Sequence, residues 1–145
     1  REQGYSGMGI IEDYGVWLEQ VPLGIRQDQL WKFEIYRKAL FLADLAWFDV
    51  ETLLADPRGK GVAWQLVDSA GSVPANIEEG YARGFGRDYA RFLTIALGSA
   101  KETRGWYYRG RHVYAPQLIT QRIDLLSEII TGLIPAINYH RRQKE

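Results

Sequence analysis

The chain has 145 residues, of which 46% are hydrophobic and 25% are charged, and this composition suits a single globular domain with a sizeable core. Cysteine is absent, which excludes disulfide bonds and thiolate metal sites. No apolar run approaches the roughly 18 residues that span a bilayer, and no basic-then-apolar signal opens the chain, so we expect a cytoplasmic protein without a membrane partner.

Basic and acidic side chains are equal in number, eighteen of each, but they are unevenly distributed. Residues 1–56 hold five basic and ten acidic side chains, whereas residues 57–145 hold thirteen basic and eight acidic ones. Such an asymmetry indicates either a polyanionic partner or charges that satisfy one another within the fold or between subunits. The second interpretation is the plainer one.

Apolar residues that recur at every third or fourth position predict an N-terminal arm followed by four long helices. The arm, residues 1–27, closes with a short amphipathic helix that Pro22 stops. We expect the long helices over about residues 28–56, 62–81, 88–113 and 116–142, with Asp28 as the N-cap of the first. Because long helices joined by short turns pack as antiparallel neighbours, the sequence predicts an all-α, up-down four-helix bundle over residues 28–142.

The segment SVPANIEEGYARGFGRDYARFLTIALGSAKE, residues 72–102, contains residues that helix interiors disfavour. Folding this hairpin about Gly84 places the pair Ala70-Gly71 opposite the pair Gly98-Ser99. We therefore expect small residues to let the two helices approach closely, which would account for glycine inside a helix.

Pro74 has no amide hydrogen, so the Ala70 carbonyl loses its helical donor. We expect a kink at this point and a small polar cluster in which the Ser99 hydroxyl or the Asn76 amide bonds that carbonyl. One helix face also carries four polar residues in helical spacing, and these are Ser72, Asn76, Glu79 and Arg83. They indicate either a site or, as the plainer interpretation, a structural stripe that fixes helix register.

These residues resemble the bacterial four helix bundle protein family, which includes proteins encoded in intervening sequences of large-subunit ribosomal RNA genes and accessory variability proteins of diversity-generating retroelements. The resemblance covers about residues 30–139. Its motif, to which the resemblance gives a structural role, comprises Ser72, Pro74, Ala75, Asn76, Ile77, Glu79, Gly80, Arg83, Phe92, Leu93, Ala96, Gly98, Ser99 and Glu102. The resemblance implies a cytoplasmic, ring-like homopentamer without catalytic residues and, for the retroelement branch, binding to nucleic acid and to a reverse transcriptase.

The residues themselves also predict self-association. Successive helix residues point about 100° apart, so three adjacent large apolar side chains cannot all enter one core. Residues 40–42, 46–48 and 106–108 each form such a triplet, with Trp47, Trp106 and Tyr108 among them. We expect some of these side chains to face outward and to be covered by further copies, although the N-terminal arm is an alternative cover within the same chain.

Catalytic and metal-binding patterns are weak. The two histidines, His112 and His140, lack the Glu-x-x-His spacing of a bundle metal site, and GYARGFG lacks the lysine and hydroxyl residue of a phosphate-binding loop. We expect no enzyme activity, no cofactor, no metal and no small-molecule substrate.

A basic stretch between residues 81 and 112 gives the first functional hypothesis, an accessory module that binds RNA, DNA or a nucleic-acid enzyme. The candidate nucleic-acid-binding residues are Arg83, Arg87, Arg91, Lys101, Arg104, Tyr108, Arg109 and Arg111. Tyr107 and Tyr108 are available for stacking, and Arg104 and Arg111 share one helix face. The alternative is a structural homo-oligomer or protein-interaction scaffold, in which this face is solvated or pairs with the acidic half of a neighbour.

Overall fold

The computed structural model describes residues 10–84 and 86–143, and every regular element within them is helical, which confirms the all-α prediction. Residues 1–9 of the predicted arm lie outside the described residues. The chain opens with three short segments, α1 (Tyr14–Gln20), α2 (Leu23–Arg26) and the 3-10 helix η1 (Gln29–Lys32). The long helices are α3 (Glu34–Leu54), α4 (Gly59–Ala82), α5 (Arg87–Arg109) and α6 (Pro116–Arg141), and the 3-10 turn η2 (Arg111–Val113) precedes α6.

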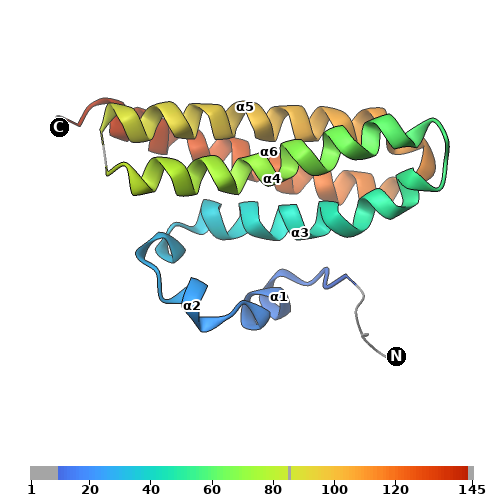
Figure 1. Cartoon of the computed structure of the whole chain (residues 1–145), viewed down its shortest axis with the longest axis horizontal. Helices are drawn as coiled ribbons and strands as arrows, with labels where there is room; N and C mark the ends of the chain where they lie inside the picture. The colour runs from blue at the N-terminus through green and yellow to red at the C-terminus, as the bar shows by residue number, and fades with distance from the viewer. Residues whose placement is uncertain (1–9, 85, 144–145) are drawn as a thin grey trace.

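The four long helices lie side by side, and their connecting turns fall at alternating ends of the bundle (Figure 1). Helix α4 packs between α3 and α5, and α6 packs against α5 and less extensively against α3. Each helix contributes fully buried leucines to one shared core, for example Leu42, Leu66, Leu93 and Leu126. Apolar residues at three- and four-residue spacing produce this core because they place one stripe of each helix inward.

Three predicted boundaries are corrected by the structure. Asp28 caps η1 rather than a long helix, since its carboxylate accepts from the Leu30 amide at 2.9 Å and the extended backbone of Phe33 separates η1 from α3. Helix α4 begins at Gly59, earlier than expected. Helix α5 ends at Arg109, so Arg111 belongs to η2 and does not share a helix face with Arg104.

The hairpin between α4 and α5 also differs from the prediction. Gly84 turns the chain with φ 106°, a backbone region that favours glycine. A Cβ added at Gly71 or Gly98 would meet open space, so the predicted close approach at these glycines is wrong. The close approach lies instead at Gly80, where an added Cβ would sit 2.7 Å from the Phe92 Cβ.

Outside the main core, a second apolar cluster joins the arm to α3 and comprises Trp17, Val21, Phe41 and Leu45. The arm therefore covers Phe41, one member of the predicted triplets. Two others do face outward, because Trp47 is 65% exposed and Tyr108 is 54% exposed. Among the described residues, no helix is long and apolar enough to cross a membrane.

Exchanging Gly80 for alanine tests the tight contact between α4 and α5. Gly80→Ala should lower the free energy of unfolding by about 1–3 kcal/mol, because the added methyl overpacks the contact with Tyr89 and Phe92. The control Gly98→Ala places the same methyl in open space and should raise stability by about 0.5–1 kcal/mol. Urea unfolding measures both, and equal effects of the two changes would contradict the assigned contact.

Candidate nucleic-acid interface

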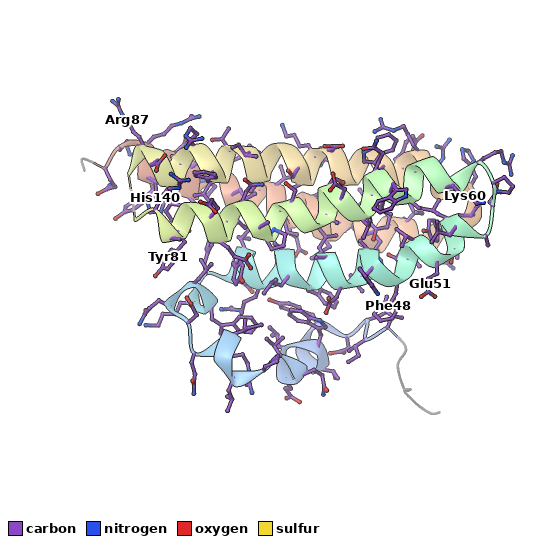
Figure 2. The ribbon with its side chains drawn as sticks, in the orientation of Figure 1. Phe48, Glu51, Lys60, Tyr81, Arg87 and His140 are labelled. Atoms are coloured by element: carbon purple, nitrogen blue, oxygen red, sulfur yellow. The ribbon has the colours of Figure 1, made fainter. Side chains whose placement is uncertain are left out.

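The candidate residues form two groups, one around the first turn of α5 and the other from the middle of α5 to η2. Arg83, Arg87 and Arg91 lie around the turn from α4 to α5, and Figure 2 shows Arg87 at the end of the bundle far from Lys60. The second group contains Lys101, Arg104, Tyr108, Arg109 and Arg111. Since α5 has 23 residues, it is about 35 Å long, and the two groups are distinct surfaces.

Carboxylates largely neutralise the first group. Arg83 forms an ion pair with Glu79 at 3.1 Å, and Arg91 forms one with Asp88 at 3.0 Å. Both guanidinium groups also lie over the Phe92 ring, at 5.1 and 4.4 Å from its centroid. The Glu79–Arg83 part of the predicted polar stripe is thus an exposed pair one helical turn apart, a kind of pair that contributes little stability.

The second group presents cations stacked on aromatic rings. The Arg109 guanidinium lies 4.1 Å from the Trp106 ring centroid, and that of Arg111 lies 4.1 Å from the Tyr108 ring centroid. Lys101 and Arg109 are exposed. Such stacking holds the planar cations in place and leaves their edges able to donate to phosphate oxygens.

Two residues predicted to belong to the basic surface point elsewhere. Arg104 is half-buried, and its Nη1 donates to the Ser127 hydroxyl of α6 at 3.2 Å. Tyr107 is fully buried, so its predicted role in stacking is wrong. Its hydroxyl donates to the Asp49 carboxylate at 2.6 Å, and burial together with that negative charge raises its pKa well above the ordinary value.

Asp49 belongs to a buried ion pair that the sequence analysis missed. Arg122 Nε donates to Asp49 Oδ2 at 2.7 Å and Nη2 donates to Oδ1 at 3.2 Å, although both residues are less than 7% exposed. The Tyr114 hydroxyl donates to the Asp49 carbonyl, and Glu12 of the arm pairs with Arg122 at 3.3 Å. Helical spacing could have revealed that Arg122 faces the core, because it lies three residues after the buried Ile119 and four before the buried Leu126, but it does not identify Asp49 as the partner.

The predicted polar cluster exists, but it is centred on Ser72 rather than on the Ala70 carbonyl. The Asn76 amide donates to both the carbonyl and the hydroxyl of Ser72 at 2.8 Å, and the Ser99 hydroxyl donates to the Ser72 hydroxyl at 2.9 Å. The hydroxyl of buried Thr103 lies 2.9 Å from that of Ser69. Helix α4 continues through Pro74. The Ser99–Ser72 and Thr103–Ser69 contacts join α4 to α5.

The remaining motif residues have separate roles. Glu102 accepts a hydrogen bond from the Trp106 indole at 2.9 Å, and so places the ring on which Arg109 stacks. Gly80 makes the tight contact with α5 described above, whereas Gly98 faces open space. Within residues 10–84 and 86–143, no three histidine, aspartate or glutamate side chains are grouped to hold a metal ion.

An apolar groove lies between α3 and α4. Its volume is about 380 Å³, and it is lined by Trp47, Val50, Glu51, Leu54, Ala63, Trp64 and Val67. Figure 2 shows Glu51 on α3, near the end of the bundle where Lys60 lies. Trp64 is 74% exposed, and its position outside the apolar seam of α4 was the signal that the sequence analysis overlooked.

Comparison with known proteins identifies the family. The model of the 23S rRNA-intervening sequence protein family matches residues 32–133. The chain belongs to this family. A solved structure from Bacteroides thetaiotaomicron, a protein with unknown function from the S23 ribosomal protein family, is similar over 71% of this chain and 97% of its own, with a TM-score of 0.66 and 24% identity. That likeness shows the fold alone, and no curated protein matches the chain.

The contact between Ser69 and Thr103 is open to a direct test. Thr103→Val keeps the side-chain shape but removes the buried hydroxyl, so the free energy of unfolding should fall by about 1 kcal/mol. Thr94→Val is the matched control, because the Thr94 hydroxyl bonds only the Ala90 carbonyl within α5, and its cost should stay below about 0.5 kcal/mol. Chemical denaturation compares the two, and a larger loss for Thr94 would refute the role given to Thr103.

Proposed function

We propose that the protein is a non-enzymatic, self-assembling accessory protein that binds single-stranded nucleic acid through the second basic group, on α5 and η2. The observation that carries the proposal is the pair of cation–aromatic stacks, Arg109 on Trp106 and Arg111 on Tyr108, together with the exposed Lys101 earlier in α5. Cations supply salt-dependent attraction to phosphates, and the exposed Tyr108 ring supplies a face for a base.

The proposed assembly is a ring-like homopentamer of up-down four-helix subunits in the cytoplasm, with residues 1–27 as an arm on a bundle formed by residues 28–142. Repetition around a ring would present the basic group several times, so that weak contacts add up along one strand. A reverse transcriptase, as an enzyme that handles such strands, is the proposed protein partner. The family membership of residues 32–133 supports this setting.

A salt titration tests nucleic-acid binding. The affinity for a labelled single-stranded RNA, followed by anisotropy, should fall as salt rises, because each neutralised phosphate releases counterions. The change Lys101→Gln with Arg109→Gln should reduce the slope of log affinity against log salt by about 1.4, which is about 0.7 for each lost contact. Lys32→Gln, which removes an exposed charge from η1, should leave the slope unchanged. Binding that ignores salt, or no binding at low salt, would refute the proposal.

The groove between α3 and α4 favours a second candidate function, a structural homo-oligomer. Trp47 and Trp64 are among the most exposed large apolar side chains of the described chain, and they line the same groove. Soluble proteins rarely leave such a patch bare, because its burial against a partner removes apolar surface from water. Both candidate functions require self-assembly, so the RNA titration is the experiment that distinguishes nucleic-acid binding from a purely structural role.

Light scattering tests the assembly itself. The wild-type chain should have the mass of a pentamer, and Trp47→Ser combined with Trp64→Ser should lower the mass below that of the pentamer. Tyr139→Ser removes another exposed aromatic ring, from α6, and should leave the mass unchanged. A monomeric wild-type chain would contradict the proposed assembly.

A further inference from the structure

The arm occupies a groove formed by the body of the protein. Tyr14 and Trp17 of α1 place their rings 5.2 and 5.3 Å from the ring of Phe41 on α3. Trp17 is 6% exposed, and Leu45 of α3 and Leu125 of α6 complete the contact. The arm therefore binds as a short amphipathic helix whose anchors follow helical spacing.

Polar contacts fix the orientation of the arm in the groove. The Trp17 indole donates to Asp44 of α3 at 2.8 Å. Glu12 pairs with Arg122 of α6 at 3.3 Å, next to the buried Asp49. The groove consequently recognises an aromatic helix with an indole donor and a preceding carboxylate, which is a more specific requirement than apolar surface alone.

The arm and the groove that it occupies are separate parts of the chain. The family match begins at residue 32, so it includes Phe41, Leu45 and Leu125 but none of the arm. Residues 22–29, which connect the two parts, are all exposed and could span at most about 28 Å if extended. The four buried residues of the arm cluster are not members of the main core, although Leu40 and Leu125 pack against both.

The outer side of the arm and its connection is apolar as well. Val16 is 49% exposed and Leu23 is 59% exposed, although an arm that served only its own bundle would need a single apolar face. Figure 1 shows α1 and α2 on the side of α3 away from α5, where a neighbouring copy can approach them. These side chains would be covered if the connection passed between two copies.

We propose that the groove between α3 and α6 is a docking site for the arm of a second copy, so that neighbouring subunits exchange arms. Exchange replaces every contact of the groove with the identical contact from the partner, and so links subunits at little cost. It additionally places the exposed connections of two chains beside each other. This linkage is separate from the Trp47 and Trp64 groove and from the basic group of α5, and it goes beyond the proposed function.

Two complementary variants test the exchange. Trp17→Ala damages the arm but keeps the groove, whereas Phe41→Ala damages the groove but keeps the arm. Untagged Trp17→Ala is mixed with tagged Phe41→Ala, both as full chains carrying Trp47→Ser and Trp64→Ser to remove the other proposed contact. Capture of tagged Phe41→Ala should recover the untagged chain. The recovery should be at least tenfold greater than with a tagged control chain that carries both Trp17→Ala and Phe41→Ala. That tagged control can offer neither an intact arm nor an intact groove.

Equal recovery with the two tagged chains would overturn the proposal. Circular dichroism checks that each variant stays helical, and Leu45→Ala replaces Phe41→Ala as the groove variant if the latter unfolds.

Discussion

Arg122 and Asp49 form an ion pair inside the bundle, and the arrangement of the surrounding helices depends on it. The pair joins α3 to α6, Tyr107 joins α5 to the same carboxylate, and Glu12 brings the arm to the same guanidinium. A buried charge is tolerated only where its partners are in place, so helix registers that separate these groups are excluded. The pair therefore selects one packing among those that apolar stripes alone would allow.

The distribution of charge over the bundle follows from this packing. Helices α4 and α6 separate α3 from α5, so the acidic first half and the basic stretch of α5 lie on different sides of the bundle (Figure 1). Arg122 of the basic second half pairs with Asp49 and Glu12 of the acidic first half, so part of the asymmetry is resolved within the fold. The exposed charges of α5 remain available for a polyanion or for a neighbouring copy.

The helices could be predicted from the sequence because their apolar periodicity depends on local spacing alone. The hairpin contacts could not, because the register between two helices depends on which side chains meet. Gly80 rather than Gly98 makes the close approach, and Ser72 rather than the Ala70 carbonyl receives the polar donors. Asp49 was missed for the same reason, since its partners lie 58 and 73 residues further along the chain. The basic residues were identified as a set, but the carboxylates beside Arg83 and Arg91 became evident only in the structure.

A double-mutant cycle on Asp49 and Arg122 tests the central claim most directly. Asp49→Leu leaves the buried Arg122 with only the half-exposed Glu12, and Arg122→Met leaves the buried Asp49 without a cation, so each should lower the free energy of unfolding by about 3–5 kcal/mol. The double variant contains neither charge and should lose far less than the sum, with a coupling of about 2 kcal/mol or more. Losses that add within about 0.5 kcal/mol would show that the two residues do not act as a pair, and would contradict the account.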